Sequence, residues 1–306
     1  MFRIALFGYA QSGKTTLFRE LTGKKDDVYD PFTPNTGIGI YKDVNIARIA
    51  EIQKSRKTVY PEFELFDFKG FPEGEGFPAN YYRNLLDKDI MVCVIDNFSP
   101  GSDPAKQASS LLMELIFYDT ERVQKLLEKA TESSGGFLLS QSEVLKKGLT
   151  LLENEKPLSE LGPDDKKLLQ GMELVTTRSM LTYLNGNARS FNPSSACCIQ
   201  RRAGEEFDAL GFYRAVMKSL SLITFYTVKG DIVQGWVIPA HYTAKQAAGR
   251  VHKDIEKGFI KAATLHLKDL VETGSWHAAK NMGILKFLGP NSELSDGDVV
   301  EFYFNR

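Results

Sequence analysis

Histidine is scarce in this chain of 306 residues. There are four, at His241, His252, His266 and His277, and residues 1–240 contain none. A Ser-His-Asp triad and a His-ligated zinc both need imidazole, so neither can operate in the first three quarters of the chain. Any chemistry in that part must use other groups.

Cysteine is also scarce, with Cys93, Cys197 and Cys198 only. The number is odd, and Cys93 lies in the apolar run 90–95. The adjacent pair lacks the C-x-x-C spacing of a metal or redox motif. We therefore expect reduced, buried thiols in a reducing compartment.

Long apolar runs are missing from the sequence. No stretch approaches the roughly 18 apolar residues of a membrane-spanning helix. The N-terminal residues 1–7 run straight into a glycine loop, and they are too short and wrongly flanked for a signal peptide. We expect a cytoplasmic protein with no membrane partner.

Charge of one sign does not dominate the composition. Lys and Arg number 38, Asp and Glu number 39, and the formal net charge is −1. This balance excludes a uniformly basic nucleic-acid binder and an acidic solubilising chain, but not a local patch. Residues 218–306 carry 11 basic and 9 acidic residues, whereas the remainder carries 27 and 30. The length suggests about two domains.

A glycine-rich loop stands near the N-terminus and fits the pattern G-x-x-x-x-G-K-[ST]. It follows a short apolar run, 4–7, and opens a helical segment, 15–21. In this context backbone N–H groups and the helix N-terminus can surround a polyphosphate, and Lys14 can reach its β- and γ-phosphates. We predict nucleotide binding by Gly8, Tyr9, Ala10, Gln11, Ser12, Gly13, Lys14, Thr15 and Thr16. The alternative is an ordinary glycine turn with an exposed lysine.

A second segment, Asp67-Phe68-Lys69-Gly70, supplies the acid that such a loop needs. Asp67 ends the alternating run 63–66, which predicts a strand. We predict that Thr15 and Asp67 hold Mg²⁺, and that the N–H of Gly70 senses the γ-phosphate. The candidate catalytic residues are therefore Lys14, Asp67 and Gly70.

Position 71 is informative because many GTPases place a glutamine there to orient the attacking water. Here it is Phe71, which has no group to do so. Either hydrolysis is slow, or backbone groups or a residue from elsewhere position the water. Simple packing of Phe71 against a neighbouring helix is compatible with both.

Strands alternating with helices predict a parallel α/β sheet with crossover connections in the first two thirds of the chain. The segments 90–95, 180–184 and 196–199 are the further strands, and 44–52 is a helix. Two helical patterns, 123–130 and 144–152, flank a Ser-Ser-Gly-Gly break and predict an antiparallel hairpin. Ordinary packed helices of the main domain are the alternative.

The pattern changes near residue 218 to short alternating runs, 222–228, 232–238 and 299–304, with one helix over 244–257. This order predicts a small α+β domain. Lys245, His252, Lys253 and Lys257 could form a basic strip on that helix, able to meet RNA phosphate. The alternative is a solvated face, since Asp254 and Glu256 interrupt it.

Taken together, these segments resemble the YchF/Obg-like ATPase family of translation-related P-loop proteins. The resemblance rests on the loop and Asp67–Gly70, on the glycine-rich stretch 73–76, on the hairpin borders 119–123 and 156–158, and above all on 246–262. The turn at 296–298 also resembles the end of that family's C-terminal domain. The resemblance spans essentially the whole chain.

The resemblance implies a Ras-like P-loop nucleotide-binding domain, 1–217, with a helical hairpin inserted at about 119–171, and a β-grasp TGS-like domain, 218–306. It implies slow hydrolysis of nucleoside triphosphates, often ATP rather than GTP, and association with ribosomes. Phe71 matches the hydrophobic residue that this family carries in place of the catalytic glutamine.

The chain departs from the family at the base-reading and switch segments. Asn185 is retained from the Asn-x-x-Glu motif, but Ala188 replaces the acid that typical GTPases use to accept the guanine protons, which argues against strong guanine selection. The alternative is that 185–187 is only a turn. The first switch is short, with Thr33 as its threonine and Thr36 as the alternate.

Three functions follow as hypotheses. The first is a slow Mg²⁺-dependent switch that binds and hydrolyses ATP, or else GTP, in contact with the ribosome. The second is a nucleotide-binding module that does not hydrolyse. The third is an RNA or ribosome adaptor that uses its C-terminal domain and keeps a vestigial nucleotide site. The oligomeric state does not follow from the sequence.

Overall fold

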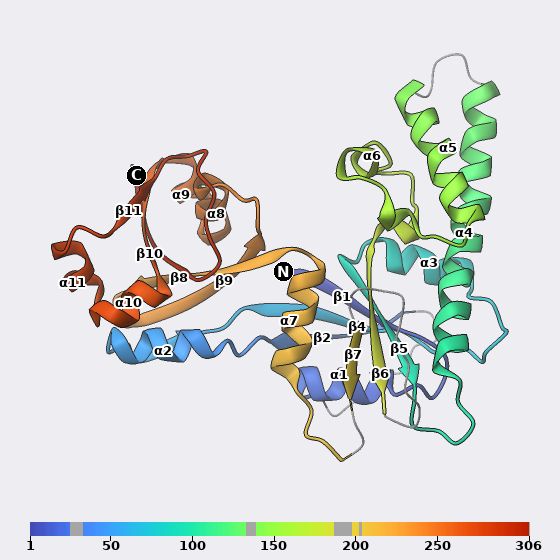
Figure 1. The fold of residues 1–306 in the computed structure, drawn as a ribbon, viewed down its shortest axis with the longest axis horizontal. Helices are drawn as coiled ribbons and strands as arrows, with labels where there is room; N and C mark the ends of the chain where they lie inside the picture. The colour runs from blue at the N-terminus through green and yellow to red at the C-terminus, as the bar shows by residue number, and fades with distance from the viewer. Residues whose placement is uncertain (25–32, 133–138, 187–197, 202–203, 306) are drawn as a thin grey trace. The chain divides into compact units, whose positions relative to one another are not determined.

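The fold was obtained as a computed structural model, which describes residues 1–24, 33–132, 139–186, 198–201 and 204–305. The chain forms two compact units (Figure 1). The first unit comprises Met1–Gly39 and Phe63–Asp208, and the second comprises Ile40–Glu62 and Ala209–Arg306. The chain therefore enters the second unit twice.

The first unit is built on a six-stranded sheet of order β2-β4-β1-β5-β6-β7. The pairs β1–β4, β1–β5, β5–β6 and β6–β7 are all parallel, which confirms the expected α/β class. The strands are β1 (Phe2–Phe7), β2 (Asn35–Ile40), β4 (Glu62–Asp67), β5 (Ile90–Asp96), β6 (Ser179–Asn185) and β7 (Cys198–Arg201).

From Ile4 to Phe7 the central strand β1 is apolar and buried, because both of its faces are covered. Ala5 and Phe7 are fully buried in a cluster with residues of α3 (Ala79–Leu86) and α4 (Pro104–Glu132). Ile4 and Leu6, on the alternate face, are also fully buried. The carboxyl end of this rigid strand leads directly into the glycine loop and α1 (Lys14–Thr22).

The predicted helical hairpin consists of α4 and α5 (Leu139–Glu153), which lie side by side (Figure 1). Leucine and valine side chains on their facing stripes, among them Val123, Leu145 and Leu152, form a separate apolar cluster. The helical layer starts earlier than residue 119 because α4 is continuous from Pro104. The chain returns to the sheet through η1 (Leu158–Glu160), α6 (Pro163–Leu168) and η2 (Val175–Thr177).

The buried carboxylate of Asp119 ties α4 to this return path. It accepts hydrogen bonds from the N–H groups of Val175 (2.9 Å) and Thr176 (2.7 Å) and from the Thr176 hydroxyl (2.6 Å). Burial raises the pKa of Asp119 to about 6. Asp119 lies in the segment whose sequence resembled the start of the family's hairpin. Its role there is structural, because its hydrogen bonds join α4 to η2.

The second unit is built on a six-stranded sheet of order β11-β10-β12-β8-β9-β3. The hairpin β8–β9 is antiparallel, and β12 pairs with β8 in parallel and with β10 in antiparallel orientation. This mixed arrangement agrees with the expected β-grasp domain. The strands are β3 (Lys57–Val59), β8 (Leu222–Lys229), β9 (Ile232–Pro239), β10 (Phe259–His266), β11 (Lys286–Leu288) and β12 (Asp298–Phe304).

Helices cover both faces of this sheet. On one face α8 (Ala244–Val251) buries Ala244 and Ala247 against Phe225, and a capping box between Thr243 and Gln246 begins the helix. On the other face lie α2 (Val44–Ile52), α10 (Leu267–Thr273) and α11 (Trp276–Asn281). A further helix, α7 (Ala209–Ser219), leads into β8.

Residues 40–62 belong to the second unit. Ile46 and Ile49 of α2 are fully buried beside Tyr226 and Val233, and β3 pairs in parallel with β9. Asp43 caps α2 by accepting from the Asn45 N–H (3.1 Å). The predicted domain boundary between residues 217 and 218 takes no account of this segment. The division into domains 1–217 and 218–306 remains a prediction.

Two further expectations need correction. The single helix expected over 244–257 is wrong: His252 is extended (φ −163°, ψ 139°) and separates α8 from α9 (Lys253–Lys257). The expectation of buried thiols holds for Cys93, whose pKa burial raises to about 12, but Cys198 is exposed. Cys197 lies outside the described residues.

Within the described ranges, no helix combines the length and the apolar character needed to cross a membrane.

Candidate nucleotide-binding site

The glycine loop between β1 and α1 depends on glycine at its last turn. Gly13, the N-cap of α1, has φ 92°, a left-handed conformation that other residues rarely adopt. A Cβ at Gly13 would also collide with the side-chain amide of Asn185. The loop therefore closes tightly, and it directs the first N–H groups of α1 toward the space in front of the sheet.

Lys14 is held inside this loop. Its side chain is only 5% exposed, and its Nζ donates to the carbonyl of Tyr9 (2.6 Å) and lies 3.4 Å from Ser12 Oγ. Burial lowers the pKa of Lys14 from 10.5 to about 8, although the carboxylate of Asp67 acts in the opposite direction. A buried cation in a cradle of backbone groups is an arrangement suited to a polyanion.

Thr15 and Asp67 meet at the mouth of the loop. The hydroxyl of Thr15 donates to Oδ2 of Asp67 at 2.8 Å, and the carboxylate is 5% exposed. A hydroxyl and a carboxylate are hard oxygen donors of the kind that Mg²⁺ prefers. The donor set therefore fits a magnesium ion, with Thr15 and Asp67 as its protein ligands or as partners of its water shell.

The segment after Asp67 lies directly on the loop. The N–H of Ala10 donates to the carbonyl of Phe71 at 2.8 Å. A Cβ added to Gly70 would stand 2.6 Å from Nζ of Lys14 and 2.7 Å from the backbone of Ala10. Only glycine fits at position 70 without displacing the backbone of Ala10.

A cavity of about 210 Å³ lies where these segments meet. Its lining includes seven residues that the sequence analysis singled out, namely Ala10, Gln11, Lys14, Thr15, Thr33, Asp67 and Gly70. It also includes Asn35, Phe68 and Lys69, which were not predicted as site residues. The glycine loop, the first switch and the segment after β4 therefore converge on one cavity.

Lys69 is the most consequential of the residues that the sequence analysis missed. It adds a second cation to the lining, and its Nζ lies 5.4 Å from the centroid of the Phe71 ring. The sequence did contain a signal for Lys69, because it lies between Asp67 and Gly70, which were both predicted as site residues. Asn35 had no such signal beyond its closeness to Thr33.

Phe71 itself packs in an aromatic cluster. Its ring centroid lies 5.8 Å from that of Phe77 and 5.7 Å from that of Tyr81, both in edge-to-face geometry. Within the described part of the chain, its side chain is not among those that line the 210 Å³ cavity. Phe71 therefore packs against a neighbouring helix, α3, which is the packing role considered for position 71 from the sequence.

The remaining predicted residues surround the cavity without lining it. Gly8 lies against the carbonyl of Val94, Ser12 is buried, and Thr16 is exposed on the first turn of α1. Asn185 donates from Nδ2 to the carbonyl of Ser12 at 3.0 Å, so it braces the loop. Ala188 lies outside the described residues.

Comparison with known proteins identifies both parts of the chain. Residues 3–130 match a family model described as "50S ribosome-binding GTPase". Residues 222–305 match the model of the YchF GTPase C-terminal domain, described as "Protein of unknown function (DUF933)". The first match covers the glycine loop and Asp67, and it shows a nucleotide-binding domain.

Full-length relatives give the same result. The chain is 28% identical to "Ribosome-binding ATPase YchF" of Escherichia coli O157:H7, with 99% of each chain covered. It is 26% identical to the protein of the same name from Bacillus subtilis (strain 168), with 98% of each covered.

A solved structure, "Structure of the Schizosaccharomyces pombe YchF GTPase", has the same fold, with a TM-score of 0.82 at 20% identity, covering 99% of this chain and 97% of that one. Because the nucleotide-binding and C-terminal models both match and the relatives align from end to end, the chain belongs to the YchF family.

Proposed function

We propose that this protein is a slow Mg²⁺-dependent nucleoside triphosphatase that works in association with the ribosome. The observation that carries the proposal is the convergence of Lys14, Thr15, Asp67 and Gly70 on one small cavity. Relatives of matching length are named ribosome-binding ATPases, which supports ATP as the nucleotide and the ribosome as the partner. GTP is the alternative nucleotide, and a cytoplasmic location stays a prediction.

Each residue has a role in the proposed site. Lys14 binds the β- and γ-phosphates, Thr15 and Asp67 hold Mg²⁺, and the N–H of Gly70 detects the γ-phosphate. A bound Mg²⁺ would neutralise the phosphate oxygens, which is the chemistry it supplies in such sites. Thr33 approaches the same cavity from the first switch.

Slow turnover follows from what stands at position 71. A phenyl ring packed on Phe77 and Tyr81 cannot orient a water molecule. Positioning of the water is left to backbone groups or to another residue. Lys69, which also lines the cavity, has a different role, because its positive charge can stabilise the transferring phosphoryl group.

Phosphate release over several hours tests the proposal. The full chain should release phosphate from ATP with Mg²⁺, and should stop when EDTA removes the metal. Lys14→Ala should abolish release, whereas Lys129→Ala, the same change at an exposed lysine of α4, should leave it unchanged. Equal release by the parent protein and Lys14→Ala would instead favour a nucleotide-binding module that does not hydrolyse.

A further inference from the structure

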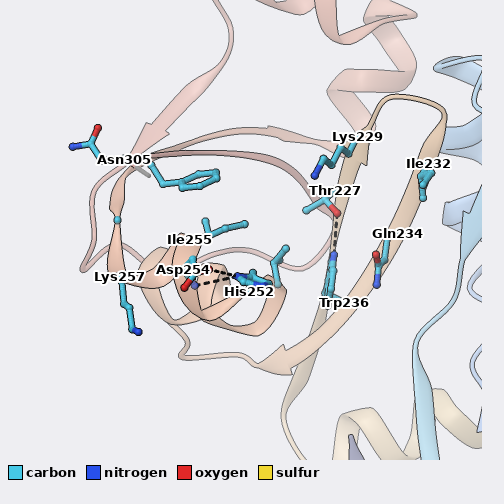
Figure 2. A pocket seen from close by; sticks show the side chains of 13 residues that line it. Thr227, Lys229, Ile232, Gln234, Trp236, His252, Asp254, Ile255, Lys257 and Asn305 are labelled. Atoms are coloured by element: carbon cyan, nitrogen blue, oxygen red, sulfur yellow. Dashed lines mark hydrogen bonds and ion pairs between the residues drawn. The ribbon is translucent and has the colours of Figure 1, made fainter.

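The second unit contains a cavity that shares no lining residue with the nucleotide site. It has a volume of about 940 Å³ and opens between the β8–β9 hairpin, the turn joining α8 to α9, and the end of β12 (Figure 2). That volume falls within the range of roughly 300–1,000 Å³ that holds small ligands. We call it the hairpin groove.

One wall of the hairpin groove carries a fixed aromatic ring. Trp236 stacks on the buried Phe225 with an interplanar angle of 16°, and its Nε1 donates to Oγ1 of Thr227 at 2.9 Å (Figure 2). The stacking and the hydrogen bond hold the indole in one orientation and satisfy its only polar group. Ile255 of α9 lines the groove together with this ring. The result is a rigid apolar platform.

The lining of the groove has an excess of positive charge. Lys229, at the end of β8, and Lys257, at the end of α9, are both exposed, and neither forms an ion pair with a described residue. The carboxylate in the lining belongs to Asp254 and lies 3.5 Å from Nδ1 of His252 (Figure 2). The groove therefore favours a ligand that combines an anionic part with an apolar, flat part.

The break between α8 and α9 gives the groove a hydrogen-bond donor. Nδ1 of His252 accepts from the N–H of Asp254 at 3.1 Å, so in the neutral ring the proton is on Nε2. The side-chain amides of Gln234 and Asn305 also line the groove and offer both donors and acceptors. These groups suit the polar edge of a base.

We propose that the hairpin groove binds an unpaired nucleotide of single-stranded RNA, with the base against Trp236 and the backbone phosphates at Lys229 and Lys257. Stacking on aromatic rings and phosphate contacts to lysine are the two components of such binding. Duplex RNA does not fit this chemistry because its bases are already stacked on one another.

An extended peptide is the weaker candidate for the same groove. Peptides that bind sheets add a strand to a free edge. The two strands in this wall are both internal, since β8 lies between β12 and β9, and β9 lies between β8 and β3.

The choice of RNA rather than DNA rests on the ribosome association in the proposed function. The positive charge and the stacking surface of the hairpin groove do not depend on that proposal.

The test uses the full chain without nucleotide. The chain has two tryptophans, so Trp276→Phe leaves Trp236 as the fluorophore. An oligouridylate of about eight nucleotides should quench its fluorescence, and a duplex of equal length should not. With two phosphate contacts, raising salt about fourfold should weaken the affinity about sevenfold. Anisotropy of labelled RNA with the unsubstituted protein gives a second readout if Trp276→Phe does not fold.

Charge reversal provides the matched control. Lys229→Glu combined with Lys257→Glu should weaken RNA binding at least tenfold, as an order-of-magnitude expectation for two phosphate contacts. Lys280→Glu combined with Lys286→Glu makes the same change in net charge at exposed lysines of α11 and β11 that lie outside the groove lining, and should change affinity less than about twofold.

Three results would overturn the inference: equal losses in both double variants, absence of quenching by the single strand, or binding of an acidic peptide in place of RNA. ATP binding and ribosome co-sedimentation, measured on the same proteins, separate the two claims. If the protein binds ATP and ribosomes but not the oligonucleotide, only the hairpin groove inference fails. If it binds the oligonucleotide but neither ATP nor ribosomes, only the proposed function fails.

Discussion

The hydroxyl of Thr15 and the carboxylate of Asp67 are joined by a 2.8 Å hydrogen bond, although 52 positions separate them in the chain. Parallel pairing of β1 with β4 brings them together, because the carboxyl ends of both strands lie at the same edge of the sheet. The two oxygens define the place where a divalent cation would contact the protein in the proposed site.

This relationship predicts how substitutions at Thr15 should act. Thr15→Val removes the hydroxyl at nearly constant volume, so nucleotide affinity should lose its dependence on Mg²⁺ and the rate of phosphate release should fall at least tenfold. Thr15→Ser retains the hydroxyl and should stay within a few-fold of the parent protein. Titration of activity with Mg²⁺ gives both values, and equal Mg²⁺ dependence in the two variants would contradict the assignment.

The lowered pKa of Lys14 predicts a pH dependence of ATP binding. In the free protein the pKa is about 8, and a bound polyphosphate would raise it. Binding should therefore take up about half a proton per site near pH 8, and affinity should fall as the pH rises above that value. Calorimetry in buffers of different ionisation enthalpy measures this uptake.

The same shift has a consequence for stability. Because the folded pKa lies below the unfolded value of 10.5, the unfolded chain binds more protons between about pH 8 and 10.5, so this group makes the free energy of unfolding rise with pH in that window. Lys14→Arg, charged throughout, should show neither the proton uptake nor this rise. An unchanged proton uptake in Lys14→Arg would assign it to another group.

Lys69 should affect turnover more than affinity. Lys69→Met removes the charge but keeps an apolar chain of similar length, so the phosphate-release rate should fall roughly tenfold or more if the ammonium stabilises the transferring phosphoryl group. ATP affinity should change less than the rate. A change in affinity alone would mean that Lys69 only attracts the nucleotide.

The C-terminal unit should not be stable without residues 40–62. A fragment of residues 209–306 lacks Ile46 and Ile49, whose burial beside Tyr226 and Val233 stabilises the unit by roughly 3–6 kcal/mol. That is a large share of the stability of a domain. A thermal melt of the fragment, followed by circular dichroism, should show no sharp transition. The same fragment joined to residues 40–62 should melt cooperatively. Equal melting curves would show that α2 and β3 are dispensable.

The nucleotide site was largely predictable because its signals are local. The loop 8–15 has a fixed spacing, and Asp67 marks the end of an apolar strand, so strand direction alone places them at one edge. The helical hairpin was predictable for the same reason. Its two helical segments, around Val123 and Val144, each show a helical periodicity that is local to that segment.

The second unit was less predictable because it depends on long-range pairing. No local pattern shows that β3 joins β9, about 175 residues away in the sequence, or that α2 leaves the nucleotide-binding unit. The break at His252 was also hidden, since Ala244 to Lys257 has a continuous helical composition and the histidine ends α8 by capping α9. The hairpin groove exists only because of that break and the β8–β9 pairing.

The most direct test of the central claim is a calorimetric titration of the full chain with ATP and with GTP, side by side, in the presence of Mg²⁺. The account predicts saturable binding of ATP at one site per chain, with ATP bound more tightly than GTP, and its loss in Lys14→Ala. Absence of binding by either nucleotide, or equal binding by Lys14→Ala, would contradict it.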